Sequence, residues 1–108
     1  MGLKLYEIFS GEELKIAEKI QQRRLQMLVH SAIYYIFNDN IISDFDWSRW
    51  GVELADLQKK YPDISSKVKF AEAFKNWDAS TGFNLPINDD WVLSKAKQLM
   101  ILRKKVIE

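Results

Sequence analysis

The chemically richest stretch of the chain runs from His30 to Trp50 and reads HSAIYYIFNDNIISDFDWSRW. A histidine, the adjacent pair Tyr34 and Tyr35, several carboxylates and two tryptophans crowd around a short polar break. Packing between helices explains aromatic residues, but it does not require a histidine and carboxylates beside them. This stretch is therefore the candidate functional part of the chain.

Each of these residues also has a purely structural explanation. The aromatic members of the group are Tyr34, Tyr35, Trp47 and Trp50. At helical spacing they would form a hydrophobic clamp between two antiparallel helices. Asp44 would serve as a first-turn carboxylate that interacts with the helix dipole. His30 lies four residues before Tyr34 on one helical face, where it can pack or donate to a ligand. No nucleophile forms a recognisable triad with it, so we expect no nucleophilic catalysis.

Composition sets the class of protein and limits its partners. With 108 residues, 47% hydrophobic and 29% charged, the chain is typical of one globular domain spanning residues 1–108. Its 16 basic and 15 acidic side chains nearly cancel, which argues against nucleic acid as a partner. The basic runs Arg23-Arg24 and Arg103-Lys104-Lys105 are predicted to be solvated helix faces. The absence of cysteine and the single histidine argue against a metal site.

The same reading gives an expected location. No apolar run approaches the roughly 20 residues of a membrane-spanning helix. No secretory signal is visible at the start, MGLKLYEIFSGEE. We therefore expect a cytoplasmic protein with no membrane partner.

Helix signals predict a hairpin over residues 11–62. The pattern Ser10-Gly11-Glu12-Glu13 matches a capping box and predicts a helix from Gly11. That helix has no proline or further glycine before Asn38-Asp39-Asn40, whose short polar side chains end it. Ser43 is the expected N-cap of a second helix, and Pro62 is expected to end that helix. A connection this short makes the two helices antiparallel neighbours.

The remaining residues, 63–108, are predicted to add one or two helices to the hairpin. Ser65-Ser66 would cap a short helix from Val68 to Trp77. Asp78 to Gly82 is predicted to be a polar turn, with an anion-binding nest as the alternative. A last helix is expected after Asn88-Asp89-Asp90. The segment from Leu3 to Phe9 is too short to decide between a strand and a packed arm. The predicted fold class is all-α, with about four helices.

The residues from Tyr34 to Asp44, YYIFNDNIISD, resemble the N-terminal helical subdomain of bacterial NAD-dependent DNA ligases. This Ia-like subdomain carries a tyrosine pair, a turn, Ile-Ser-Asp and then an aromatic residue and an aspartate. The resemblance covers approximately residues 30–62 and includes the close of the second helix, Gln58-Lys59-Lys60-Tyr61-Pro62. Similar short stand-alone chains occur among phage and prophage proteins, so the resemblance implies such an origin and a bacterial host cell as the location.

In the ligases this subdomain holds the nicotinamide mononucleotide (NMN) half of NAD. The resemblance therefore implies NAD or NMN as a ligand, with no cofactor required for a reaction. The ligand-binding residues carried over by position are Tyr34, Tyr35, Asp44 and Trp47, with His30 as a further candidate. The family has an aspartate after its aromatic residue, whereas Ser48 follows Trp47 here, so binding should be weak. The Lys-x-Asp-Gly motif of ligase chemistry is absent from these 108 residues.

Three functional hypotheses follow from these patterns. The leading one is a small non-catalytic phage or prophage protein that binds a host or phage protein, for example anti-phage defence machinery. The alternative is a module that binds NAD, NMN or a related nucleotide. The third is a weak nucleic-acid binder that uses Arg23-Arg24 or the basic tail.

Overall fold

Five helices make up the regular structure of residues 4–107, the part of the chain that this computed structural model describes. They are α1 (Leu5–Ile8), α2 (Gly11–Tyr35), α3 (Asp44–Lys60), α4 (Pro62–Ser65) and α5 (Asp90–Ile107). The predicted all-α class is confirmed. None of these helices combines the length and apolarity that crossing a membrane needs.

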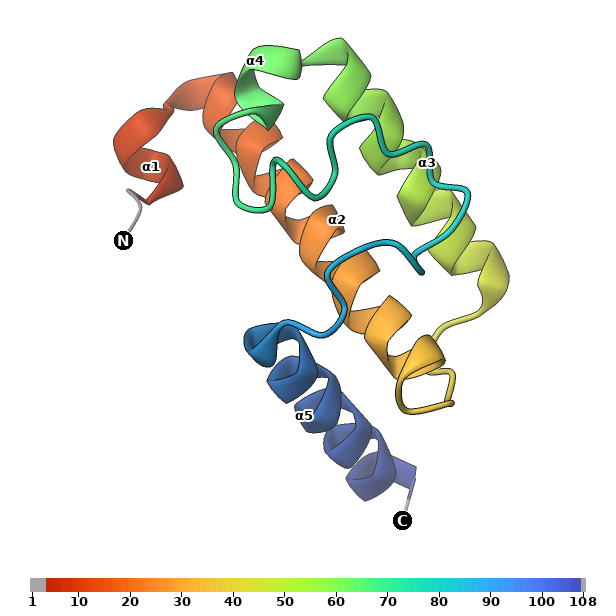
Figure 1. The fold of residues 1–108 in the computed structure, drawn as a ribbon. Helices are drawn as coiled ribbons and strands as arrows, with labels where there is room; N and C mark the ends of the chain where they lie inside the picture. The colour runs from red at the N-terminus through yellow and green to blue at the C-terminus, as the bar shows by residue number, and fades with distance from the viewer. Residues whose placement is uncertain (1–3, 108) are drawn as a thin grey trace.

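The predicted hairpin is present as α2 and α3, which run antiparallel to one another (Figure 1). Asn38 turns the chain after α2 with a left-handed φ of 55°, a conformation that asparagine tolerates well. Ser43 then caps α3, because its hydroxyl accepts a 3.0 Å hydrogen bond from the Asp46 amide. The short polar connection therefore acts as expected at both helix ends.

The start of α2 differs from the prediction in its chemistry. The helix begins at Gly11 as expected and Ser10 is its N-cap, but the Ser10 side chain accepts no capping hydrogen bond. Gly11 has a left-handed φ of 58°, so the chain enters the helix along a path that does not bring the hydroxyl to an amide. The predicted capping box is wrong. The preceding segment, open between strand and arm, forms the single turn α1 from Leu5; Leu3 lies outside the described residues.

Helix α2 is the centre of the core. It contacts each of the other four helices, and in Figure 1 α3 and α5 lie on opposite sides of it. The fully buried apolar side chains of α2 are Ala17, Ile20, Met27, Leu28, Ala32 and Ile33. They form one cluster with Leu54 of α3 and with Val92 and Ala96 of α5. This burial explains why a 25-residue helix with a polar middle is stable in this protein.

The segment between α4 and α5 contains no regular helix, so the helix predicted from Val68 to Trp77 is wrong. Pro62 does not simply end α3 but opens the short helix α4 at its first position. Beyond α4, left-handed φ values at Phe70 and Asn76 interrupt any helical path. The segment runs along the hairpin and crosses α2 before α5 begins (Figure 1).

A buried arginine holds this irregular segment to the hairpin. The Arg24 side chain is 2% exposed, and its guanidinium lies 5.8 Å from the Phe74 ring. It donates to Gln58 Oε1 at 2.8 Å and to three carbonyl oxygens: that of Ser65, the last residue of α4 (3.1 Å), and those of Val68 (3.0 Å) and Lys69 (3.2 Å) beyond it. Carbonyls past a helix end need donors, and Arg24 supplies them. Burial lowers the pKa of Arg24 to about 10, so it stays charged at neutral pH.

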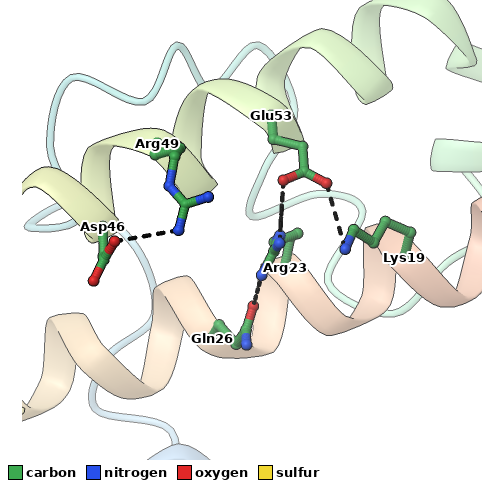
Figure 2. Close-up of polar contacts among 6 residues, drawn as sticks. All are labelled: Lys19, Arg23, Gln26, Asp46, Arg49 and Glu53. Carbon is green, nitrogen blue, oxygen red and sulfur yellow. Dashed lines mark hydrogen bonds and ion pairs between the residues drawn. The ribbon is translucent and has the colours of Figure 1, made fainter. Parts of the chain in front are cut away.

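The prediction that Arg23-Arg24 is a solvated face is therefore wrong, because both side chains make specific contacts. Arg23 points toward α3, where its guanidinium pairs with Glu53 at 3.1 Å (Figure 2). Lys19 reaches the other Glu53 oxygen at 3.5 Å, one turn earlier on α2. Such partly exposed pairs each stabilise by less than about 1 kcal/mol. Their role is to fix how α2 and α3 align along their length.

We predict that Arg24→Met lowers the free energy of unfolding by about 3 kcal/mol, because the carbonyls that Arg24 serves lose their donor while remaining buried. Urea denaturation followed by circular dichroism measures the loss. Arg49→Met is the matched control, since Arg49 is 59% exposed and its ion pair with Asp46 contributes less than about 1 kcal/mol. Equal effects of the two substitutions would contradict the role given to Arg24.

Candidate ligand-binding cleft

A cleft of about 240 Å³ lies where α2 ends and α3 begins. Its walls come from the last turns of α2, the connection at residues 40–43, the first turn of α3 and residues 80–82. The five residues predicted from the sequence all line it: His30, Tyr34, Tyr35, Asp44 and Trp47. The fold thus gathers the candidate residues around one open space.

The tyrosine pair does not form a sealed clamp between the helices. Tyr34 and Tyr35 are 52% and 41% exposed, although the preceding Ile33 is fully buried. Their rings meet edge to face with centroids 4.9 Å apart. Because α2 ends here, both phenols extend past the core and remain accessible to a ligand.

The tryptophans behave differently from the tyrosines. Trp47 and Trp50 are half-buried and pack against the core. Trp47 also lines the cleft, and its ring meets Trp77 edge to face at 6.0 Å. The structural and the functional explanation therefore apply to different aromatic residues. Trp50 belongs to the clamp between the helices, the tyrosines line the cleft, and Trp47 does both.

Asp44 provides the negative charge of the cleft. It is exposed at the first position of α3, next to the capping Ser43. Within the part of the chain that is described, no hydrogen bond or ion pair engages its side chain. A carboxylate placed in this way can accept hydrogen bonds from hydroxyl or amide groups of a ligand.

Two polar atoms near the base of the cleft are buried without a partner among the described residues. They are His30 Nδ1 and Ser31 Oγ. Burial lowers the pKa of the His30 imidazole below its ordinary value, so the ring is neutral at pH 7. A neutral imidazole and a hydroxyl can each donate or accept a hydrogen bond. These atoms are chemically suited to an uncharged polar group rather than to an anion.

The contribution of residues 80–82 to the cleft was not predicted from the sequence. Residues 80–82 were interpreted as part of a polar turn, with an anion-binding nest as the alternative, yet Ser80, Thr81 and Gly82 line the cleft and contact the end of α2. The Thr81 hydroxyl lies 3.1 Å from the Tyr35 hydroxyl. Hydroxyl groups followed by glycine were visible in the sequence, but no local pattern indicated that this turn meets α2.

The charges around the cleft restrict its ligands. Asp44 is the one formally charged side chain lining it among the described residues, and no lysine or arginine does so. Arg103 lies near the rim, but it donates to the Asn40 carbonyl and pairs with Asp39 at 3.5 Å. Across the described side chains, no group of three or more carboxylates or histidines is placed to hold a metal ion. The cleft is best suited to a neutral or cationic ring, with any phosphate outside.

Comparison with known proteins finds partial similarity to bacterial DNA ligases. The DNA ligase of Pseudothermotoga lettingae is 39% identical over 49 residues, which are 45% of this chain and 7% of that ligase. The DNA ligases of Thermosipho africanus and Petrotoga mobilis are each 33% identical, over 55 and 51 residues. Those matches cover 51% and 47% of this chain and 8% of each ligase.

The chain thus spans only 7–8% of the length of these curated relatives. No protein-family model and no solved structure matches it. The similarity nevertheless agrees with the relationship predicted from the residues around the tyrosine pair. A segment of about half the chain is therefore related to bacterial DNA ligases.

Proposed function

We propose that this chain is a non-catalytic binding module whose cleft takes the nicotinamide nucleoside part of NMN, NAD or a related nucleotide. The observation that carries the proposal is the convergence of Tyr34, Tyr35, Asp44 and Trp47 on one open cleft. The segment related to DNA ligases supports it, because the ligand was inferred from that resemblance. The proposed scaffold is the Ia-like hairpin formed by α2 and α3.

The chemistry of the cleft suits an oxidised nicotinamide ring. The ring is a flat pyridinium cation, which aromatic faces such as those of Tyr35 and Trp47 attract. The Asp44 carboxylate adds negative charge and accepts from the ribose hydroxyls or the carboxamide. Since no basic side chain among the described residues lines the cleft, the phosphate extends into solvent. Weak binding follows, because the ligand's anionic end gains no partner.

The proposal of a non-catalytic role rests on the sequence and on one position of the cleft. The Lys-x-Asp-Gly motif needed for adenylation is absent from the 108 residues. Ser48 lines the cleft where the ligase pattern has an aspartate, so one ligand carboxylate is replaced by a neutral hydroxyl. The missing motif removes the adenylation chemistry, while Ser48 weakens binding but leaves the aromatic residues and Asp44 in the cleft.

We predict that Asp44→Asn weakens NMN binding about tenfold, because the substitution keeps the shape but removes the charge that strengthens hydrogen bonds. Isothermal titration calorimetry at millimolar NMN measures the affinity. Asp46→Asn is the control, since Asp46 also lies in the first turn of α3 but pairs with Arg49 and does not line the cleft. No heat with the wild-type protein, or equal losses in both variants, would refute this site.

We also predict selectivity for charge. Oxidised NMN should bind roughly 3–30 times more tightly than its reduced form, whose ring is uncharged, because the cation–aromatic attraction is lost. Nicotinic acid mononucleotide should bind more weakly than NMN, since its extra carboxylate meets Asp44. Quenching of tryptophan fluorescence can follow all three titrations, with adenosine monophosphate as the control ligand. Equal affinities for the three nicotinate and nicotinamide ligands would contradict the cation-binding chemistry.

The second candidate function is protein binding, and one observation favours it. Phe45 is 74% exposed between Asp44 and Asp46, and Phe83 is 64% exposed on the segment that meets Tyr35. Exposed aromatic residues beside a cleft are typical of interaction sites. In this proposal the chain is a phage or prophage protein that binds a host or phage protein, including components of anti-phage defence.

We predict that Phe45→Ser abolishes co-purification of such a partner from a bacterial host while leaving NMN affinity within about twofold, because Phe45 does not line the cleft. Asp44→Asn should have the reverse effect. Affinity purification with quantitative mass spectrometry provides the comparison. A partner recovered equally with wild-type protein and Phe45→Ser would exclude this surface.

A further inference from the structure

The wall formed by residues 80–82 comes from outside the ligase-like stretch at residues 30–62. It joins the cleft through long-range contact, since Thr81 lies 46 positions from Tyr35 in the chain. A ligand in the cleft would contact both the hairpin and residues 80–82, because both line it. The cleft is therefore completed within this chain by a segment that the resemblance does not include.

Several contacts hold the wall in place. The Trp77 indole N–H donates to the Thr81 carbonyl at 2.8 Å, and Asp78 accepts from the Ser80 amide at 3.0 Å. The hydrogen bonds from Ser80 lower the pKa of the Asp78 carboxyl. The Phe83 ring meets Tyr35 edge to face at 5.4 Å. The turn has a defined position against the end of α2.

Gly82 sets how close the wall approaches α2. It is buried, and a Cβ atom at this position would lie 2.0 Å from Ser31 Oγ and 3.2 Å from the Trp47 ring. Contacts as short as the first do not occur between real atoms, so any larger residue would push the wall away. The close packing of the wall against Ser31 and Trp47 thus depends on glycine at position 82.

Thr81 links the wall to the tyrosine. Its hydroxyl accepts from the Phe83 amide at 3.1 Å, which leaves its own proton and a second lone pair for the Tyr35 hydroxyl. Tyr35 is otherwise exposed at the end of a helix, where a side chain has rotational freedom. The contact with Thr81 restricts the phenol to one orientation facing the cleft.

We propose that residues 80–82 are a specificity wall of the cleft and that Thr81 is a positioning residue that orients the Tyr35 ring against the ligand. This proposal rests on the function proposed above. The wall restrains the aromatic face before the ligand arrives, so less entropy is lost when the ligand binds. The contact of Gly82 with Ser31 and Trp47 also fixes where the wall lies, and so it limits the space left in the cleft for a ligand.

The test compares NMN affinity, by calorimetry, in the full chain carrying Thr81→Val, Thr81→Ser, Tyr35→Phe or the Val and Phe changes together. Thr81→Val keeps the shape of threonine but removes the hydroxyl, and affinity should fall about fivefold. Thr81→Ser should restore affinity to within about twofold, because the hydroxyl is kept. The double variant should bind no more weakly than Tyr35→Phe alone, since both changes break the same contact.

Thermal denaturation shows whether each variant is folded, and Thr81→Ser provides a second reading if Thr81→Val is unstable. Wild-type affinity in Thr81→Val, or additive losses in the double variant, would overturn the positioning role. If the wild type binds NMN and Asp44→Asn weakens binding but Thr81→Val does not, this inference fails and the proposed function stands. If the wild type binds no NMN at millimolar concentration, both fail.

Discussion

The structure depends on the burial of one charged group, the Arg24 guanidinium, in the middle of α2. The last residue of α4 and the irregular segment after it have carbonyl oxygens that no following helical turn satisfies, and three of these accept from Arg24. Gln58 of α3 joins the same network, because it accepts from Arg24 and donates to the Phe74 carbonyl at 3.2 Å. A single side chain thus ties α2, α3 and the irregular segment together. Burying a charge costs free energy, but satisfying several carbonyls at once offsets that cost.

This network also affects the cleft, because residues 80–82, which form one of its walls, lie farther along the same segment. Phe74, whose carbonyl Gln58 holds, packs edge to face on Trp77 at 5.2 Å. The Trp77 indole N–H in turn donates to the Thr81 carbonyl, so the wall is held at a fixed position relative to the core. The chain of contacts therefore runs from the buried arginine to residues that line the cleft. Loops that carry function usually rely on a rigid scaffold in this way.

The parts of the fold that local chemistry determines could be predicted from the sequence. Asn38 and Ser43 act within a few residues of themselves, so their effects on the helix ends were visible without tertiary information. The candidate residues on α2 and α3 were found because aromatic and charged side chains crowd around one turn in the sequence and because that stretch resembles the ligase subdomain. A ligase-related segment was also predicted, and the comparisons support it. Whether these residues bind a nucleotide stays a prediction.

The errors share one physical cause, which is contact between residues far apart in the chain. Arg24 was predicted to be in solvent. That prediction failed because the partners of Arg24 lie 34 to 45 positions away in the chain and cannot be inferred from its neighbours on the helix. The helix predicted from Val68 failed for the same reason. Burial of Val68 and Phe74 and the hydrogen bonds to Arg24 stabilise a path with left-handed residues that local propensity disfavours. The wall at residues 80–82 was missed because it follows from that path.

The division between local and long-range determinants has a consequence for the cleft itself. The hairpin supplies the aromatic faces and Asp44 from residues close in sequence, so any chain with this hairpin would present the same half of a site. The other half is set by Gly82 and Thr81, whose positions depend on the packing of the irregular segment. In a ligand site built from two such halves, the first determines which chemical group is attracted and the second determines which shape fits. A chain that retained the hairpin but changed the irregular segment would keep the attraction and lose the selection by shape.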